Sequence, residues 1–232
     1  MLIDTITYGD NYIYLLTVGS RSAVIDPSDA DVVLNTLKSK GTDLTQILVT
    51  HNHMDHTAGC RKLRKLTGIE AEKPKSDSIS VLDKTVKVIP TPGHTTGSVC
   101  YYFPEKETVF TGDTLFIAGC GRVFTGDYAG MWQSLLKLRA LPPETQVYCG
   151  HNYTRDNLKF ALTVEPANHD AAAALEETGR SGAITVPSSI SRENKINPFL
   201  RADNETLKSV LNMTEAPALE VFTLLRKQKD AW

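Results

Sequence analysis

Apolar runs rich in β-branched and aromatic residues alternate with helical patterns over the first two-thirds of the chain. Short runs of this kind predict strands, and they lie at Tyr12–Val18, Ala23–Asp26, Gln46–Thr50, Val86–Pro90, Ser98–Phe103, Thr108–Thr111 and Gln146–Cys149. Apolar residues spaced three and four positions apart predict helices at Ala30–Ser39, Ala58–Leu66 and Met131–Leu141. This mixture predicts a layered fold of strands and helices.

The strand pattern stops after His151, and the rest of the chain is predicted to be helical. The expected helices lie at Asn157–Val164, Ala171–Glu177, Glu205–Leu211 and Pro217–Lys229. A looser stretch separates the second from the third, from Gly182 to Asn197. We therefore expect two domains, a large one at residues 1–155 and a small helical one at 156–232.

Composition excludes several classes of protein. The chain has 232 residues, 41% of them hydrophobic and 22% charged, and its net charge of −2 indicates neither a nucleic-acid nor a membrane partner. An apolar run of about 18 residues, which a membrane span needs, is absent from the sequence. Asp4 and Asp10, without basic residues, precede the first apolar run and argue against a secretory signal. We expect a cytoplasmic monomer.

The cysteines do not indicate a disulfide framework. Cys60, Cys100, Cys120 and Cys149 are widely spaced and form no C-x-x-C pair. Disulfides are unusual in a cytosolic chain. We expect buried or neutral thiols.

Histidines cluster directly after the predicted strands. Five of the six lie in three short segments: His51-Asn52-His53-Met54-Asp55-His56, Thr91-Pro92-Gly93-His94 and Gly150-His151. Asp113 follows another predicted strand in the same way. Because residues two apart in an extended turn point the same way, His51, His53 and Asp55 can converge. Imidazole and carboxylate together suit zinc, iron or manganese.

Seven candidate ligands are too many for one tetrahedral zinc ion. They suit two metal ions that share one carboxylate, an arrangement that holds and activates a hydroxide between the ions. A single histidine is usually structural, but so dense a group without sulfur nearby is hard to explain in that way. His169 has no such neighbours, and we expect it to be a solvated helix residue.

The pattern His51-x-His53-x-Asp55-His56, with His94, Asp113 and His151, resembles the ligand set of the metallo-β-lactamase superfamily. The resemblance runs through nearly the whole chain. It implies an α+β fold, a four-layer αββα sandwich with the metals at the loop-bearing edge of its two sheets, followed here by a small C-terminal α-helical domain.

Further segments are similar to glyoxalase II within that superfamily. They are Thr111–Phe116, Gly119–Arg122, Cys149–Thr154, Asn157–Ala161, Asn197–Arg201 and Arg226–Asp230. The last two lie in the helical part, which most of the superfamily lacks. They therefore favour the thioesterase over a β-lactamase.

The resemblance implies a role for each candidate ligand. The implied ligands of the first metal are His51, His53 and His94, and those of the second are Asp55, His56 and His151, with Asp113 as the bridge. Zinc is the expected metal, with iron or manganese also compatible. Asp113 and Asp55 are the expected catalytic carboxylates, and Asp113 can orient the hydroxide and accept its proton. Asp26 is expected to support the metal loop.

The resemblance also implies substrate contacts. Arg122, Tyr153, Arg226 and Lys229 match positions that hold glutathione. Arg226 and Lys229 are three apart on a predicted helix and so share a face, where they could hold a carboxylate; a solvated basic helix end is the alternative. We expect Arg226→Ala to raise KM with little loss of kcat. Phe124 stands where some members have a tyrosine, so one hydrogen bond is lost.

The implied reaction is hydrolysis of S-(2-hydroxyacyl)glutathione thioesters, typically S-D-lactoylglutathione to D-lactate and glutathione, as in methylglyoxal detoxification. A thiol of pKa ~8.5 leaves readily as thiolate, so a hydroxide nucleophile and a metal-polarised carbonyl suffice. A covalent role for Cys120 is conceivable. The sequence also leaves open an iron-dependent persulfide dioxygenase of the same superfamily, a lactonase or β-lactamase, and a non-catalytic metal-binding module.

Overall fold

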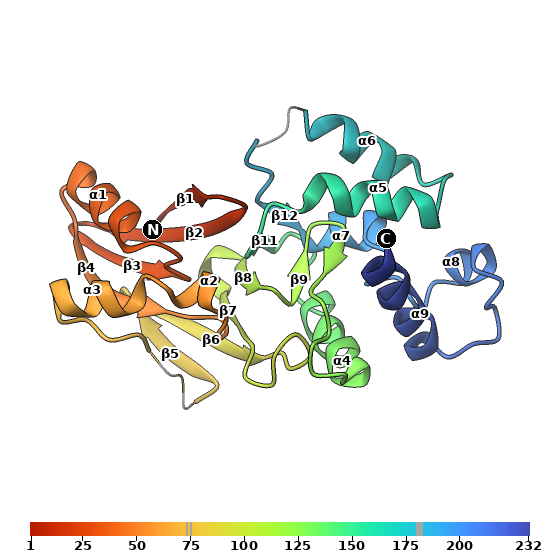
Figure 1. Cartoon of the computed structure of the whole chain (residues 1–232), viewed down its shortest axis with the longest axis horizontal. Helices are drawn as coiled ribbons and strands as arrows, with labels where there is room; N and C mark the ends of the chain where they lie inside the picture. The colour runs from red at the N-terminus through yellow and green to blue at the C-terminus, as the bar shows by residue number, and fades with distance from the viewer. Residues whose placement is uncertain (73, 75, 180–182) are drawn as a thin grey trace.

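The computed structural model describes residues 1–72, 74, 76–179 and 183–232 (Figure 1). Within these residues the chain first forms a four-stranded sheet, in which β3 and β4 run parallel and the other neighbours are antiparallel. Its strands, in spatial order, are β1 (Leu2–Tyr8), β2 (Asn11–Val18), β3 (Arg21–Ile25) and β4 (Asp43–Leu48).

A second sheet has the strand order β12-β11-β8-β7-β6-β5. In chain order its strands are β5 (Ser78–Val81), β6 (Lys84–Pro90), β7 (Val99–Phe103), β8 (Thr108–Gly112), β11 (Gln146–Cys149) and β12 (Ser188–Ser189). β8 and β11 are parallel neighbours, whereas the other pairs are antiparallel. A separate antiparallel hairpin consists of β9 (Leu115–Phe116) and β10 (Gly119–Cys120).

The alternation of side chains along β2 assigns its residues to two different cores. Tyr12, Tyr14 and Leu16 lie between the two sheets, where the Tyr14 ring contacts Phe110 at 5.0 Å between centroids. Ile13 and Leu15, between them in sequence, face the opposite way, toward the helices α1 (Ala30–Lys40) and α3 (Cys60–Thr67). β2 is therefore buried on both faces.

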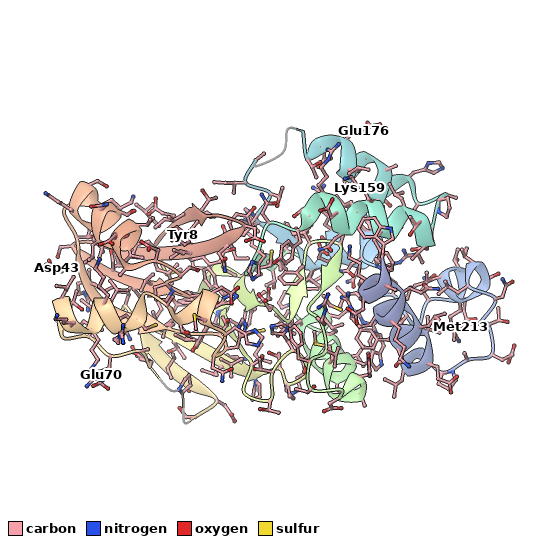
Figure 2. All side chains as sticks on the ribbon, viewed as in Figure 1. Tyr8, Asp43, Glu70, Lys159, Glu176 and Met213 are labelled. Carbon is pink, nitrogen blue, oxygen red and sulfur yellow. The ribbon has the colours of Figure 1, made fainter. Side chains whose placement is uncertain are left out.

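The outer face of the second sheet is covered by α4 (Tyr128–Arg139), which packs Met131 and Leu135 against Val109. The layers thus run α, β, β, α, which confirms the predicted sandwich. Figure 2 shows side chains filling the middle of the molecule, while labelled residues such as Asp43 and Glu70 lie at its periphery.

The remaining helices lie at the end of the molecule away from α1 and α3 (Figure 1). They are α5 (Thr154–Val164), α6 (His169–Glu177), α7 (Ile190–Ile196), α8 (Glu205–Val210) and α9 (Ala218–Ala231). The single-turn helices α2 (Met54–Thr57) and η1 (Pro104–Lys106) complete the elements. Among the described helices, none is both long and apolar enough to cross a bilayer.

The prediction that strands stop after His151 is wrong. The prediction of a loosely structured segment up to Asn197 is also wrong. β12 adds to the second sheet by pairing Ser188 with Val147, and helix α7 begins directly after it. A two-residue strand carries no periodic signal, and α7 has few apolar residues. Residue 182, where the stretch was predicted to begin, lies outside the described residues. The domain boundary at 155/156 stays a prediction; it falls in the first turn of α5.

All four cysteines are free thiols, as the sequence predicted. Burial raises the pKa of Cys60 and Cys120 to about 11 and that of Cys100 and Cys149 to about 12. These thiols are therefore protonated and weakly nucleophilic at neutral pH.

Candidate metal centre

The seven candidate ligands lie in segments that follow strands of both sheets, and two of them, Asp55 and His56, belong to α2. β4 of the first sheet leads into the segment 51–56, which contributes four of them. The other three, His94, Asp113 and His151, follow β6, β8 and β11 of the second sheet. Because β8 and β11 are parallel neighbours, Asp113 and His151 leave the sheet at the same edge.

His51, His53 and His94 converge on one point. Nδ1 of His53 lies 3.1 Å from Nε2 of His51 and 3.0 Å from Nε2 of His94. The rings of all three pairs meet at steep angles, with interplanar angles of 78° to 82°. Three nitrogen atoms thus point into one small space, and this is the first ligand group.

Asp55, His56 and His151 form a second group. Nε2 of His56 lies 3.1 Å from Nε2 of His151. Oδ2 of Asp55 lies 3.3 Å from the same atom of His151 and 3.6 Å from Nε2 of His56. Asn11 donates to the Asp55 carboxylate from Nδ2 at 3.3 Å and so restrains it.

Asp113 lies between the two groups. Its Oδ2 is 3.4 Å from Nε2 of His94 and 3.3 Å from Nε2 of His151. Its Oδ1 is 3.4 Å from Nε2 of His56, yet this buried atom has no hydrogen-bond partner of acceptable geometry among the described residues. The carboxylate thus lies within 3.4 Å of a ring nitrogen of each group.

The electrostatics of the centre favour a cation. Burial raises the pKa of Asp113, but the neighbouring imidazoles of His151 and His56 outweigh burial and hold that pKa well below its usual range. Burial lowers the pKa of His56, but the charges of Asp26 and Asp113 outweigh it and raise the pKa to about 11. The buried carboxylates therefore stabilise positive charge at this place.

The donor set fits metal ions. Nitrogen ligands of a tetrahedral zinc ion, each ~2.1 Å from it, stand about 3.4 Å apart, close to the 3.0 and 3.1 Å separations within the first group. Burial, followed by the charge of His56, lowers the pKa of His51 to about 4 and so favours its neutral imidazole. A metal ion bound at His56 would replace the proton that its raised pKa favours. Imidazole and carboxylate donors without thiolate suit zinc, iron and manganese alike.

Asp26 holds the segment that carries the ligands. Its Oδ1 accepts a hydrogen bond from the backbone N–H of Thr50 at 2.7 Å. Its Oδ2 accepts hydrogen bonds from the Thr50 hydroxyl at 2.6 Å and from Nδ1 of His56 at 2.9 Å. The bond to Nδ1 fixes the ring orientation and directs Nε2 toward the second group. The predicted support of the metal loop by Asp26 is confirmed in this geometry.

Two glycines allow the ligand loops to approach each other. A Cβ atom on Gly121 would lie 1.9 Å from the carbonyl oxygen of Asp113. A Cβ atom on Gly150 would lie 2.3 Å from Oδ1 of Asp113 and 2.8 Å from the His56 ring. A side chain at Gly121 would therefore displace the backbone of Asp113, and one at Gly150 would displace its carboxylate.

The ligand groups form the floor of a cavity of about 650 Å³. Its walls include all four residues predicted to contact substrate: Arg122, Tyr153, Arg226 and Lys229. Tyr153 stacks on the ring of His151 with centroids 4.7 Å apart and an interplanar angle of 5°. The structure thus brings together every site residue that the sequence predicted.

Arg226 is buried, and its two terminal nitrogens are engaged. Nη1 donates to the carbonyl oxygen of Cys120 at 2.7 Å, and Nη2 donates to Asp230 at 3.1 Å. Arg122 also contacts Asp230, with Nε 3.3 Å from its carboxylate. Asp230 therefore sits between two arginines, a role that we did not predict, although its spacing four residues after Arg226 was a usable signal.

Lys229 lies in the same wall of the cavity and contacts Trp232. Its Nζ is 3.9 Å from the centroid of the Trp232 ring, a cation–π distance. Burial and the nearby charge of Arg226 lower the pKa of Lys229 to about 8. The sequence contains no signal that would have placed Trp232 at the cavity.

Phe124 projects into the cavity mouth with 62% of its surface exposed. Its ring contacts the rings of His53 and His94 at 5.7 and 5.3 Å between centroids, and the guanidinium of Arg122 lies 5.6 Å from it. The aromatic surface is thus kept while a tyrosine hydroxyl is absent. His169, by contrast, is an exposed residue at the start of α6, as predicted.

Comparisons with known proteins place this geometry in a family. A model of the metallo-β-lactamase superfamily matches residues 6–79 and 70–151, and a model of the hydroxyacylglutathione hydrolase C-terminus matches residues 152–232. A B3 metallo-β-lactamase, BLEG-1, superposes with a TM-score of 0.68 over 86% of this chain and 99% of its own, at 22% identity. That likeness concerns the fold.

Sequence relatives narrow the assignment. A hydroxyacylglutathione hydrolase of Maricaulis maris is 42% identical over an alignment that covers 96% of this chain and 95% of the relative. The enzyme of that name from Rhodospirillum rubrum is 42% identical over an alignment that covers 95% of this chain and 94% of the relative. With a metal-binding donor set, a two-metal superfamily fold and relatives along its whole length, the chain belongs to the hydroxyacylglutathione hydrolase (glyoxalase II) family of the metallo-β-lactamase superfamily.

Proposed function

We propose that this protein hydrolyses S-(2-hydroxyacyl)glutathione thioesters, with S-D-lactoylglutathione as the typical substrate and D-lactate and glutathione as products. The observation that carries the proposal is a single cavity that joins a floor of imidazoles and carboxylates to a wall bearing Arg122, Arg226 and Lys229. Glutathione is an anionic tripeptide, so a thioester of it needs a cationic wall next to the reacting centre.

The donor set would hold two divalent ions, which we propose to be zinc. His51, His53 and His94 would hold one ion, Asp55, His56 and His151 the other, and Asp113 would bridge them. When bound, such ions lower the pKa of a water ligand to about 7 and polarise a carbonyl oxygen.

The carboxylates of the chain complete the chemistry. Asp113, an ionised carboxylate in the lining of the cavity, would orient the attacking water and accept its proton. Asp55, which Asn11 restrains, has its Oδ2 3.3 Å from Nε2 of His151. The glutathione thiolate leaves with a pKa of ~8.5 and needs little protonation. Cys120 has no part as a nucleophile, because burial raises its pKa to about 11.

Arg122, Tyr153, Arg226 and Lys229, which all line the cavity, would hold the glutathione part. Both Nη atoms of Arg226 already donate hydrogen bonds, to Cys120 and to Asp230. Arg226 would therefore attract the anionic substrate by its charge, without a direct hydrogen bond from either Nη atom. Lys229 is the more accessible cation. The four free thiols suit a reducing compartment, and we propose that the enzyme acts in the cytoplasm.

The test is loss of S-D-lactoylglutathione, followed by thioester absorbance, with zinc-loaded protein. We expect kcat/KM of at least ~10⁴ M⁻¹s⁻¹. A background rate, combined with oxygen uptake on glutathione persulfide in the iron-loaded protein, would overturn the proposal in favour of the dioxygenase. Metal analysis of His151→Ala, expected to retain about one ion in place of two, tests the ligand set separately.

A further inference from the structure

The hairpin formed by β9 and β10, here called hairpin 115–120, is too small to hold its own shape. Each strand has two residues, and an isolated hairpin of this size is marginal at best in water. Its turn also places Ala118 at φ +54°, a left-handed conformation that a residue with a Cβ rarely adopts. The surroundings must therefore impose this conformation.

Glu193 of α7 reaches the turn of the hairpin. Its carboxylate is fully buried, and Oε2 accepts the backbone N–H of Ala118 at 2.8 Å and Nδ2 of Asn197 at 3.0 Å. The other oxygen accepts the hydroxyl of Ser188 at 2.5 Å. A buried carboxylate is costly unless its acceptors are satisfied, and here one of the partners is the strained residue of the turn.

Asn197 holds both sides of the same turn. Fully buried itself, it donates from Nδ2 to the carbonyl oxygens of Phe116 at 3.2 Å and Gly119 at 3.0 Å. Asn157 of α5 donates to the carbonyl oxygen of Ile117 at 3.1 Å. With the bonds of Glu193 and Arg226, side chains of the C-terminal helices contact the backbone of every residue from 116 to 120. Figure 1 shows β9 beside α7.

Both ends of hairpin 115–120 continue into the metal centre. The hairpin begins two residues after Asp113, the bridging carboxylate. Arg122 lies two residues beyond the other end, and its carbonyl oxygen accepts a hydrogen bond from Nδ1 of His94 at 2.8 Å. This bond orients the His94 ring so that its Nε2 points toward His53. In the first strand, the Phe116 ring lies edge-on to His151, with centroids 6.0 Å apart.

We propose that Glu193 and Asn197 are positioning residues of the metal centre, which act through hairpin 115–120 on the orientation of Asp113 and His94. Neither residue lines the cavity, so neither contacts substrate. The catalytic part of this inference rests on the proposed hydrolysis. The part that concerns metal affinity does not.

The experiment compares Glu193→Leu with Glu193→Gln. The glutamine can keep one oxygen for Ala118 and Asn197 and turn its amide toward the Ser188 hydroxyl, which can accept as well as donate. Leucine has a side-chain volume similar to that of glutamate but no oxygen atom that could accept these hydrogen bonds. The readouts are Zn²⁺ affinity by competition with a chromophoric chelator, the visible spectrum of the Co²⁺ form, and kcat and KM separately.

Glu165→Leu is the matched control. Glu165 is a second buried glutamate of the helical region, it pairs with Arg201, and it makes no contact with hairpin 115–120 among the hydrogen bonds of the described residues. Its loss should cost stability without reaching the metal centre. It therefore separates a positioning role from general destabilisation.

We expect Glu193→Leu to lower metal affinity and kcat each by about 10- to 100-fold, with KM changed less than about threefold and a shifted Co²⁺ spectrum. Glu193→Gln should remain close to the parent protein, and Glu165→Leu should lower only the melting temperature. Parent-like metal affinity and spectrum in Glu193→Leu, or an equal loss of kcat in Glu165→Leu, would overturn the inference.

Two provisions keep the test decisive. If Glu193→Leu is not recovered folded, Asn197→Ala removes two bonds to the hairpin and leaves the carboxylate in place, and the same outcomes apply. If the parent protein does not hydrolyse the thioester, the Zn²⁺ and Co²⁺ measurements still decide the positioning role. Failure of the proposed function is thus distinct from failure of this inference.

Discussion

Nδ1 of His56 lies 2.9 Å from Oδ2 of Asp26, and both side chains are buried. Asp26 has φ +52°, and its carboxylate also holds the backbone N–H of Thr50, the residue that precedes the ligand segment. One carboxylate thus restrains a ligand ring and the backbone that carries four ligands. A residue outside the two proposed ligand groups thus restrains the second of them.

Asp26→Asn should therefore weaken metal binding without removing a ligand. The amide has one acceptor oxygen in place of two, so it cannot satisfy both Thr50 and His56. We expect metal affinity to fall on the order of 10-fold or more, measured by chelator competition. Asp83→Asn, an exposed change in an ion pair with Arg21, is the control. Equal affinities for the two variants would contradict this account.

The KM for the anionic thioester should rise as pH increases through about 8. Burial and the charge of Arg226 lower the pKa of Lys229 to about 8. The ammonium form, which attracts the substrate, is thus present below that pH and is lost above it, so binding weakens toward alkaline pH. The measurement is KM against pH, with kcat recorded separately.

Lys229→Arg tests the origin of that pH dependence. Arginine stays charged to a pKa above about 12, so KM of this variant should be flat where the parent rises. Lys227→Arg is the matched control, because Lys227 lies two residues away on α9, outside the cavity lining. A rise in KM that survives in Lys229→Arg would show that another group titrates.

Chelation should loosen the contact between the two sheets. Four of the proposed ligands follow the first sheet and three follow the second, so ions bound to them would join the two sheets. With free metal a thousand times its dissociation constant, stabilisation is about 4 kcal/mol, which corresponds to a fall of about 10 °C in Tm on removal. Scanning calorimetry before and after dialysis against a chelator measures it. Return of Zn²⁺ should restore Tm, and an unchanged Tm would contradict the arrangement.

Phe124→Tyr should strengthen substrate binding. The ring already lies at the cavity mouth against His53 and His94, so the change adds a hydroxyl without moving the ring. A neutral hydrogen bond contributes about 1 kcal/mol, so KM should fall about fivefold with kcat nearly constant. Phe124→Leu, which removes the aromatic surface, should raise KM. A KM for Phe124→Tyr at or above the parent value would exclude this hydrogen bond.

The sequence contained the parts of the fold whose physical signal is local. β2 was predicted because seven consecutive apolar or β-branched residues, Tyr12–Val18, can only be buried, and α1 because apolar residues recur on one face. The ligand segment was found because four metal-type residues stand within six positions, 51–56. The supporting role of Asp26 was expected because it ends a predicted strand and because the resemblance to the superfamily implies such a role for an aspartate there.

Features that depend on tertiary contacts were missed. β12 consists of two residues and forms only because it pairs with β11, a strand that is distant in sequence. α7 is capped by Ser189 and has Glu193 buried at its centre, which a hydrophobic pattern interprets as a solvated position. The burial of Arg226 could not be predicted either, since its acceptor is a backbone carbonyl 106 residues away in sequence. Polar groups satisfied over such distances leave no periodic signal.

The bonds from α7 to hairpin 115–120 have a consequence for how the enzyme is made. Synthesis runs from the N-terminus, and domains begin to fold in that order. All seven ligands, up to His151, leave the ribosome before Glu193 and Asn197 do. A nascent chain at that stage has every donor atom but not the side chains that shape the hairpin between Asp113 and Arg122. Maturation of the metal centre is therefore deferred until the helical region has been translated.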